Sequence, residues 1–289
     1  FERTRMAGVS VRWAVSLRQT ESLPHFELLF RQALQSLTIE DIEAQRRFRY
    51  RDDSLACIVG RLLIRRAFGE VGVAWHDAKQ RIRRTDRGKP IDAAGELKFN
   101  VSHQGDLVVL AGTSNAADEA IGVDVMRIDE DVNGGAKGRI ERLRRAFTPR
   151  ERETMLKWTE ERDRWRSFYR HWCLKEAVLK TTGVGISEDL GKLEFWLEEE
   201  VQGDAVISST RYLQDGVPQP RFVFEESNIG DDHVVAVGRI TENEIASPDP
   251  RFTVVDLPFL LEPSSIEEHL EDGGAEEFAT FDAKQWKHF

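Results

Sequence analysis

The chain has 289 residues, enough to bury one large hydrophobic core or two of ordinary size. It is 40% hydrophobic and 32% charged, and no apolar run approaches the roughly 18–20 residues of a membrane helix, so we expect no membrane span. Residues 1–13 lack the apolar stretch of a signal peptide, and the two cysteines, Cys57 and Cys173, lie in apolar segments with helical character. Buried free thiols fit a reducing compartment, so we expect a soluble, cytoplasmic protein.

The formal net charge of −10 is unevenly distributed along the chain. Residues 241–289 contain twelve acidic and three basic side chains, whereas residues 137–170 contain twelve basic and six acidic ones. The acidity therefore belongs mostly to the tail. A basic segment on a nearly neutral body indicates an acidic partner, although a solvated helix face would have the same composition.

In the first part of the chain, the hydrophobic pattern predicts strands alternating with helices. The expected strands cover residues 11–17, 82–88, 97–101 and 107–112, and the expected helices cover 27–37, a segment starting at Thr38, and 48–68. The helix 48–68 carries apolar residues at helical spacing and should lie in the core. Pro90 is expected to close off regular structure after Gly88, and residues 102–106 are expected to form a polar turn.

The second part of the chain repeats this order. Asp124 lies between valines in a strand predicted at 121–128, and a buried carboxylate there needs a charged partner or a metal. A glycine-rich linker at 129–138 precedes a basic helix at 139–146, and Thr148 with Pro149 predicts the start of another helix. Further predicted strands cover residues 193–197, 205–210, 221–225 and 233–240.

These patterns predict an α/β (α+β) fold with an internal duplication, in which the helices of Cys57 and Cys173 occupy equivalent places. We expect an N-terminal half at 1–118, a C-terminal half at 119–241 and an acidic extension at 242–289. The extension is loop-rich apart from an apolar island at 252–261, so we expect it to be peripheral.

A predicted helix that ends near Gly183 combines aromatic and charged side chains. Trp172, Cys173 and Glu176 share one of its faces, and Lys180 follows Glu176 at i+4. Taken alone, this carboxylate and ammonium could be a solvated pair worth a few tenths of a kcal/mol.

Three further features are suited to binding phosphate. They are a glycine, lysine and proline at 88–90, the hydroxyl and imidazole of Ser102 and His103, and the paired carboxylates of Asp124 and Glu176, which are ligands of the kind that Mg²⁺ prefers. The glycine at 88 lacks the spacing of a P-loop, and a single histidine in a turn is more often structural than functional.

The order of these motifs is more specific than any one of them. The series is Gly88-Lys89-Pro90, Phe99-Asn100-Val101-Ser102-His103, Ile121-Gly122-Val123-Asp124-Val125, Phe147-Thr148-x2-Glu151 and Trp172-x2-Lys175-Glu176-Ala177-x2-Lys180. Over residues 11–240 it resembles the 4′-phosphopantetheinyl transferases, in particular the large, broad-specificity class. Within that class it is most similar to the eukaryotic enzymes that activate aminoadipate-semialdehyde dehydrogenase and fatty acid synthase.

The resemblance implies a monomer of two pseudo-twofold-related halves, each a small, mainly antiparallel sheet packed with a long helix, with coenzyme A and Mg²⁺ between them. A serine of an apo acyl carrier protein or carrier domain would attack coenzyme A and receive its 4′-phosphopantetheine arm, releasing adenosine 3′,5′-bisphosphate. The implied carriers belong to fatty acid synthase, aminoadipate-semialdehyde dehydrogenase, and polyketide or nonribosomal peptide synthases. Neither a nucleic acid nor a membrane is implied as a partner.

The resemblance also assigns roles to individual residues. The adenine and 3′-phosphate end of coenzyme A would contact Arg84, Arg87, Gly88, Lys89 and Pro90. Phosphates would be held by Asn100, Ser102 and His103. Asp124 and Glu176 would hold the metal and Lys180 would neutralise a pyrophosphate oxygen, while Glu176 or a metal-bound water would take the serine proton.

The chain departs from the family pattern at two places. Bacterial members usually carry Asp-x-Glu, whereas position 126 is Met, so a water is expected to complete the metal shell. The early helix carries Asp41 and Ala44 where basic residues are usual, so Arg46 or Arg47 is the expected substitute. Two other functions stay open: a Mg²⁺-dependent hydrolase of coenzyme A or nucleotide pyrophosphates, and a catalytically silent module that binds coenzyme A or a carrier.

Overall fold

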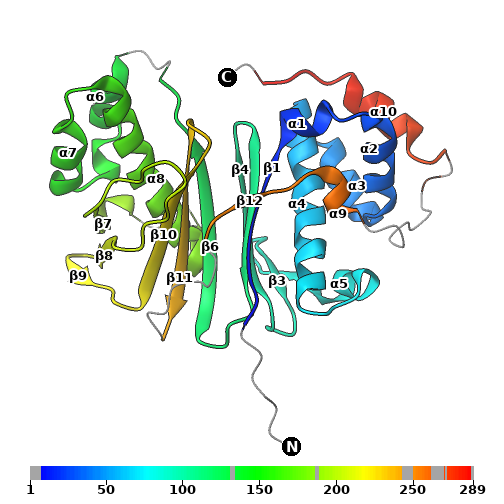
Figure 1. Cartoon of the computed structure of the whole chain (residues 1–289), viewed down its shortest axis with the longest axis horizontal. Coiled ribbons are helices and arrows are strands. Elements are labelled where there is room, and N and C mark those ends of the chain that lie inside the picture. Colours follow the sequence, from blue (N-terminus) through cyan, green and yellow to red (C-terminus); the bar gives the residue numbers. More distant parts are fainter. Residues whose placement is uncertain are drawn as a thin grey trace, which may run out of the picture.

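The computed structural model describes residues 8–130, 134–185, 189–242, 250–261, 270 and 272–287. Two sheets stand near its centre, each with a long helix on its outer side (Figure 1). In the described parts of the chain, none of the helices has the length and apolar character to cross a membrane. The two sheets with their helices form two α/β halves that lie side by side (Figure 1).

The N-terminal half is built on a four-stranded sheet with the strand order β12-β1-β5-β4. Its strands are β1 (Ser10–Ser16), β4 (Lys98–Gln104), β5 (Leu107–Thr113) and β12 (Thr253–Val254). β5 is antiparallel to β1 and β4, and β12 is parallel to β1. The long helix α4 (Arg51–Glu70) buries its apolar side against this sheet, as predicted, and forms the main core of the half.

Shorter elements complete the N-terminal half. They are α1 (Leu17–Glu21), α2 (Phe26–Gln35), α3 (Ile39–Arg46), α5 (Trp75–Arg81), β2 (Ile82–Arg84) and β3 (Pro90–Asp92). Thr38 caps α3 through its side chain, as predicted. The expectation that Pro90 ends regular structure is wrong, because Pro90 opens β3 opposite Arg84. A proline fits there because β3 pairs with β2 alone and its other edge does not require the missing N–H.

The C-terminal half is built on a three-stranded antiparallel sheet with the order β10-β11-β6 and the 22-residue helix α8 (Glu161–Thr182) on one face. The strands are β6 (Asp118–Arg127), β10 (Phe222–Ile229) and β11 (His233–Thr241). Around them lie α6 (Gly135–Arg142), η1 (Arg144–Ala146), α7 (Pro149–Leu156), η3 (Leu190–Lys192), β7 (Leu193–Trp196), β8 (Arg211–Gln214) and β9 (Val217–Pro218). Thr148 and Glu151 form a capping box at the predicted start of α7.

Three local predictions in this part of the molecule are wrong. The linker expected at 129–138 gives way to α6 from Gly135 onward, and the basic helix expected at 139–146 divides into α6 and η1. The strand expected at 205–210 is a single bridge between Ile207 and Glu226, and the strand lies later, at β8. At the end of this segment, the Thr210 hydroxyl donates to the Glu226 carboxylate of β10.

The two halves meet through the faces of their sheets that do not carry the long helices. Ala14, Val109 and Ala111 of the N-terminal sheet share one buried cluster with Val123 and Val235 of the other. Strands β4 and β6 lie side by side at this junction but belong to different sheets. Side-chain hydrogen bonds connect them. The order of layers is therefore helix, sheet, sheet, helix (Figure 1).

The C-terminal segment does not lie at the periphery, contrary to expectation. β12, α9 (Leu257–Leu260) and α10 (Ala275–Asp282) return to the N-terminal half, where β12 pairs with β1, α9 contacts α4, and α10 contacts α2 and α4 (Figure 1). Leu257, Leu260 and Phe281 are fully buried in its core, where Phe281 lies 4.4 Å from the Phe30 ring centroid to centroid. The acidic composition hid these apolar anchors, which are spaced too widely to show a periodic pattern.

Candidate active site

Asp124 occupies the centre of β6, at the junction of the two halves. Because side chains alternate along a strand, Gly122, Asp124 and Met126 face α8, whereas Val123 and Val125 enter the core between the sheets. Asp124 is 2% exposed. The charged partner that its burial requires must therefore come from α8 or from the neighbouring strand β4.

Lys180, in the last turn of α8, supplies that partner. Its Nζ lies 2.5 Å from Asp124 Oδ1 and 2.6 Å from Ser102 Oγ. The Ser102 hydroxyl in turn donates to Asp124 Oδ1 at 2.9 Å. Three residues from β4, β6 and α8 thus form one closed hydrogen-bonded group across the junction. The resemblance assigned all three to phosphate and metal binding, and the structure brings them together.

Glu176 lies one turn before Lys180 on α8 and is half-buried. Burial raises its pKa above the ordinary value, and the Asp124 charge adds to the effect, while Lys180 acts in the opposite direction. Asp124 Oδ2 is buried and has no hydrogen-bond partner among the described residues. An orphaned carboxylate oxygen beside a second carboxylate fits a divalent cation, which would satisfy the oxygen and offset the repulsion.

Asp124 and Glu176 are the two carboxylates that come together at this place in the described part of the chain. No group of three or more His, Cys, Asp or Glu side chains that could hold a metal occurs among these residues. Met126 lies on the same face of β6 as Asp124 and packs against the core beneath α8. An apolar side chain, that of Met126, therefore stands where the Asp-x-Glu pattern has its glutamate.

Two glycines set the end of α8 against the sheet. A Cβ on Gly122 would lie 2.3 Å from Thr181 N and 2.6 Å from the Ala177 carbonyl oxygen. A Cβ on Gly238 would lie 2.9 Å from Thr181 Oγ1, which donates to the Gly238 carbonyl. Because neither position has room for a side chain, the last turn of α8 sits directly on β6 and β11, and Lys180 reaches Asp124.

Ser102 and His103 lie within β4, so the polar turn expected at 102–106 is wrong for its first residues. The strand continues because Asn100 Oδ1 accepts from Val123 N at 2.9 Å and Gln104 Oε1 accepts from Arg127 N, which links β4 to β6. Asn100 is thereby engaged between the strands. His103 is exposed and lies on the opposite face of β4 from Ser102.

The predicted nucleotide-binding residues at 84–90 form the tip of the β2–β3 hairpin. Arg84 Nη1 donates to the Gly88 carbonyl at 2.8 Å within that tip. Arg87 Nη1 donates to the Gly183 carbonyl at 3.1 Å, beyond the end of α8. The Lys89 ammonium donates to the Lys180 carbonyl and, at 3.3 Å, to that of Ile121. Burial lowers the pKa of Lys89 to about 8.

Arg46 and Arg47 were the expected substitutes for the missing basic residues of the early helix. The Arg46 guanidinium pairs with the buried Glu277 carboxylate of α10. Arg47 is exposed at the end of α3. The two arginines therefore differ, because one is engaged by the C-terminal segment and the other faces solvent.

The role of Lys175, next to Glu176, was not predicted from the sequence. Its ammonium is fully buried, 2.9 Å from Glu151 Oε2 and 2.9 Å from the Leu190 carbonyl oxygen. The same Glu151 caps α7 and accepts from Phe195 N. Lys175 thus fixes α8 to α7 and to the chain before β7. The start of α7 at Thr148 was predicted from the sequence, but the buried partner of Glu151, about four helical turns into α8, was not.

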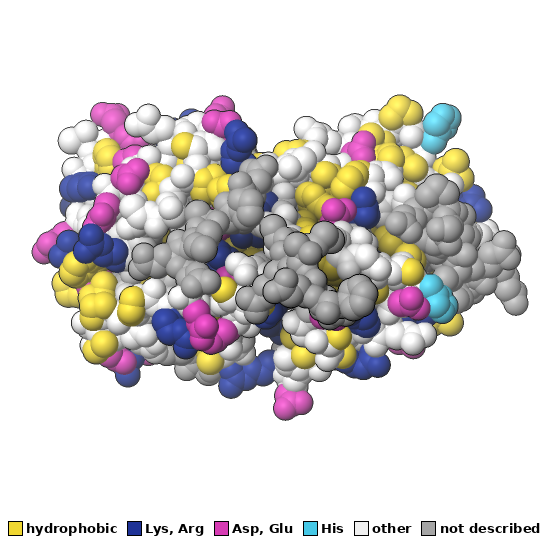
Figure 2. Space-filling view, turned by 60° about the horizontal axis from the view of Figure 1, so that its bottom comes forward, with side chains coloured by type: hydrophobic (Ala, Val, Ile, Leu, Met, Phe, Trp, Pro, Cys, Tyr) yellow, Lys and Arg dark blue, Asp and Glu magenta, His cyan; other side chains and the backbone are white. Residues whose placement is uncertain are grey.

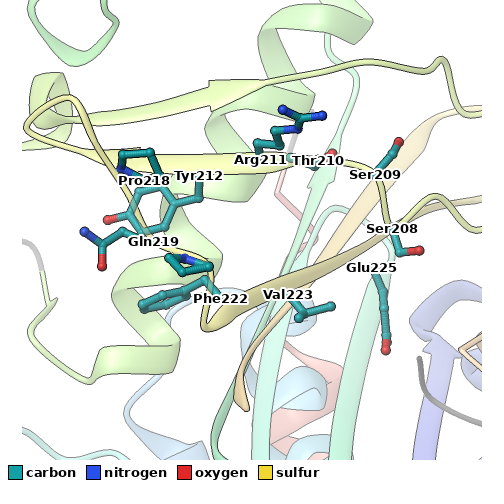
Figure 3. Close-up of a pocket in the computed structure, with 11 residues that line it drawn as sticks. Ser208, Ser209, Thr210, Arg211, Tyr212, Pro218, Gln219, Phe222, Val223 and Glu225 are labelled. Atoms are coloured by element: carbon teal, nitrogen blue, oxygen red, sulfur yellow. The ribbon is translucent and has the colours of Figure 1, made fainter. Parts of the chain in front are cut away.

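A pocket in the C-terminal half contains none of the predicted site residues. It lies between the β8–β9 hairpin and β10 and is lined by side chains that include Tyr212, Phe222 and Glu225 (Figure 3). On the face shown in Figure 2, basic and acidic side chains are interspersed over both halves.

Comparisons with known proteins agree on one family. Residues 25–115 match the model of the 4′-phosphopantetheinyl transferase N-terminal domain, and residues 120–238 match that of the 4′-phosphopantetheinyl transferase superfamily. The chain is 34% identical over 235 residues to the L-aminoadipate-semialdehyde dehydrogenase-phosphopantetheinyl transferase of Rattus norvegicus, covering 78% of this chain and 74% of the relative.

Two further relatives give similar figures. The chain is 34% identical over 213 residues to the Homo sapiens protein of the same name, covering 71% of this chain and 67% of the relative. It is 34% identical over 214 residues to a phosphopantetheinyl transferase of Thraustochytrium sp., covering 68% of each. Together the two family models span most of the two halves, and the first match includes Ser102 whereas the second includes Asp124 and Lys180. The chain therefore belongs to the 4′-phosphopantetheinyl transferase superfamily, as its motifs predicted.

Proposed function

We propose that this transferase moves the 4′-phosphopantetheine arm of coenzyme A to a serine of an apo carrier domain and releases adenosine 3′,5′-bisphosphate. The observation that carries the proposal is the closed group of Asp124, Ser102 and Lys180 beside Glu176. It concentrates two carboxylates and an ammonium where the two halves meet. Such a set is suited to holding a metal and a pyrophosphate together.

Asp124 and Glu176 would hold Mg²⁺, and the buried Asp124 Oδ2 supports this because it has no other partner in the described residues. When bound, the metal would supply charge stabilisation at the phosphate oxygens. Lys180 is already placed beside Asp124 and would neutralise a pyrophosphate oxygen from the other side. Phosphoryl transfer relies mostly on positioning and charge stabilisation, and these residues would supply both.

In the transfer itself, the carrier serine Oγ would form a bond to the β-phosphorus of coenzyme A. The bond between that phosphorus and the bridging oxygen would break, so that the bisphosphate leaves with the electron pair. Glu176 would accept the serine proton, the general-base role of a carboxylate placed beside the reacting hydroxyl. A water at the site is the alternative acceptor.

The coenzyme A nucleotide would bind against the β2–β3 hairpin, where Arg84, Gly88 and Pro90 supply a guanidinium and close backbone. The carriers would be acyl, peptidyl or aminoacyl carrier domains of the kinds named above, with the relatives' names favouring the aminoadipate-semialdehyde dehydrogenase type. We further propose that the protein acts as a monomer, because the two halves of one chain complete the site. Its two free cysteines are the reason for proposing the cytoplasm as its compartment.

The deciding experiment incubates the protein with Mg²⁺, coenzyme A labelled in the pantetheine arm, and an apo carrier protein. Label on the carrier serine, detected by a mass gain of the intact carrier, is the expected result. Free phosphopantetheine would indicate a hydrolase, and unchanged coenzyme A would indicate a silent binding module. A carrier with its serine replaced by alanine serves as the matched control, which must remain unlabelled.

A further inference from the structure

The tip of the β2–β3 hairpin is a compact, self-bonded turn. Thr85 N donates to the Lys89 carbonyl at 2.9 Å, and Gly88 N donates to the Thr85 carbonyl at 2.8 Å. Gly88 has φ +81°, a backbone conformation that glycine adopts without strain. The side chain of Lys89 therefore leaves from a fixed point of the N-terminal half.

From that point the Lys89 ammonium enters the C-terminal half. It donates to the backbone carbonyl of Lys180 and to that of Ile121, at 3.3 Å for the latter. Lys180 is the residue whose side chain bonds Asp124, and Ile121 precedes Asp124 by three residues on β6. One ammonium thus joins the two backbone segments that carry both members of the Asp124–Lys180 pair.

The position is favourable for a cation. The last carbonyls of an α-helix have no intrahelical donors, and positive charge near them is stabilised by the helix dipole. α8 ends at Thr182, and Arg87 donates to the Gly183 carbonyl in the same region. Two hairpin cations therefore hold the end of α8, and Lys89 is the more buried of them.

The bonds of Lys89 also limit what else it can bind. A lysine ammonium has three donors, and two of them are committed to backbone carbonyls. A phosphate contact through either of these two donors would leave a backbone carbonyl without its partner, which is costly, so only the third donor is open to a ligand. Arg84, whose guanidinium is exposed on the same hairpin, carries no such commitment to the other half.

We propose that Lys89 is a positioning residue of the transferase, which holds Lys180 and β6 in register from the opposite half, and that it does not bind the 3′-phosphate of coenzyme A. The proposal rests on the proposed function. It assigns to the hairpin a second task besides nucleotide binding, namely to keep the catalytic ammonium and carboxylate together when the halves take up the substrate.

The test measures kcat and KM of the Lys89→Met variant and of the wild type with each of two donor substrates, coenzyme A and 3′-dephospho-coenzyme A. Methionine keeps about the length of the lysine side chain but removes its charge. If Lys89 acts through Lys180, kcat should fall about tenfold or more, by the same factor for both donors, because small displacements of reacting groups are costly. The KM for coenzyme A should change less than about twofold. Lys89→Arg should recover most of the lost kcat, since it keeps the cation.

Lys98→Met is the matched control, because Lys98 Nζ contacts a backbone carbonyl of the same half, that of Gly95, at 3.5 Å and lies outside the site. It should leave kcat and KM as in the wild type. The proposal is overturned if Lys89→Met raises the KM for coenzyme A while dephospho-coenzyme A is used as well as by the wild type, the pattern of a lost 3′-phosphate contact. Should Lys89→Met not fold, Lys89→Gln, which keeps one donor, undergoes the same comparison.

A second readout separates this proposal from the proposed function. Hydrogen exchange of the amides in 121–124 and 179–183 should accelerate in Lys89→Met and stay unchanged in Lys98→Met, whether or not the protein transfers phosphopantetheine. Unchanged exchange in both variants would contradict the positioning role. If the wild type yields no labelled carrier but the exchange rates change as expected, the proposed function fails and the Lys89 assignment to the end of α8 stands.

Discussion

Arg12 of β1 and Glu225 of β10 form a buried ion pair across the two halves, with 2.8 Å between Nη2 and Oε2. Both side chains are nearly inaccessible, at 1% and 2% exposure. Arg239 joins them, 3.2 Å from Glu225 Oε1 and 2.8 Å from Asp118 Oδ1. Two guanidinium groups and two carboxylates therefore form a compensated network inside the protein, away from the Asp124 site.

Arg12→Met should destabilise the protein by about 3–5 kcal/mol, because it leaves the Glu225 carboxylate buried beside a single guanidinium. Urea unfolding measures the change. The double variant Arg12→Met with Glu225→Leu should be more stable than Arg12→Met alone, since it removes both charges. A double variant at least as unstable as the sum of the two single variants would contradict the ion-pair interpretation.

Asp124→Ala and Glu176→Ala should each reduce kcat/KM for carrier modification by at least about a hundredfold, roughly 2.7 kcal/mol of transition-state stabilisation. The reason is that the proposed metal has no other protein carboxylate in the described residues. Asp77→Ala, on the exposed side of α5, is the matched control and should retain full activity. A well-folded Asp124 or Glu176 variant that keeps more than about a tenth of the activity would refute the metal assignment.

Met126→Glu should tighten Mg²⁺ binding, because Met126 shares the α8-facing side of β6 with Asp124 and added ligand charge raises the affinity for a hard cation. Titration of transferase activity with Mg²⁺ gives the half-saturating concentration, which should fall. Thermal unfolding without metal provides the control, since a carboxylate beside Asp124 should then lower the stability. If the Mg²⁺ dependence is unchanged in a stable variant, position 126 does not reach the metal.

Reversing Arg142 and Arg145 to Glu should raise the KM for the carrier protein severalfold and flatten its salt dependence. These side chains lie exposed on and after α6, within the basic segment 137–170, and exposed charges act chiefly on encounter with an acidic partner. The KM for coenzyme A should stay the same. An equal loss for both substrates would place the segment at the nucleotide site, and no change at all would make it a solvated face.

The free energy of unfolding should fall in mild acid because the His171 side chain is fully buried. Burial lowers its pKa to about 3, against about 6.5 in an unfolded chain, so the unfolded state binds the extra proton between these values. The contribution is complete above pH 6.5 and should decrease by about 2 kcal/mol by pH 5.

Urea unfolding at pH 7 and pH 5 measures this decrease. His171→Gln, which cannot take up the proton, should show a smaller difference between the two pH values, whereas His76→Gln on the exposed side of α5 should match the wild type. A His171→Gln variant with the full wild-type difference would assign the acid sensitivity to other groups.

The elements predicted from the sequence are those in which one physical pattern dominates. α4 and α8 carry apolar residues at helical spacing over five turns or more, and the Thr148 capping box marks the start of α7 through local contacts. Asp124 was singled out because a carboxylate among valines cannot stay unpaired. For these features, the information lies within a few residues of the chain.

The predictions that failed depend on contacts between distant residues. Ser102 belongs to a strand because Asn100 and Gln104 bond to β6, which a reading of 97–106 alone does not reveal. Likewise, the inward direction of the Lys89 ammonium depends on where α8 ends in the other half. The order of motifs identified the family, but the partners of each side chain required the packed structure.

The return of residues 250–261 and 272–287 to the N-terminal half has a consequence for how the chain matures during synthesis. Phe281, Leu257 and Leu260 belong to a core whose other fully buried members all precede residue 111. The C-terminal half, by contrast, is continuous from β6 to β11. During synthesis, the C-terminal half is therefore fully translated before the N-terminal half is complete. Until α10 has emerged from the ribosome, the apolar surface around Phe30 stays uncovered.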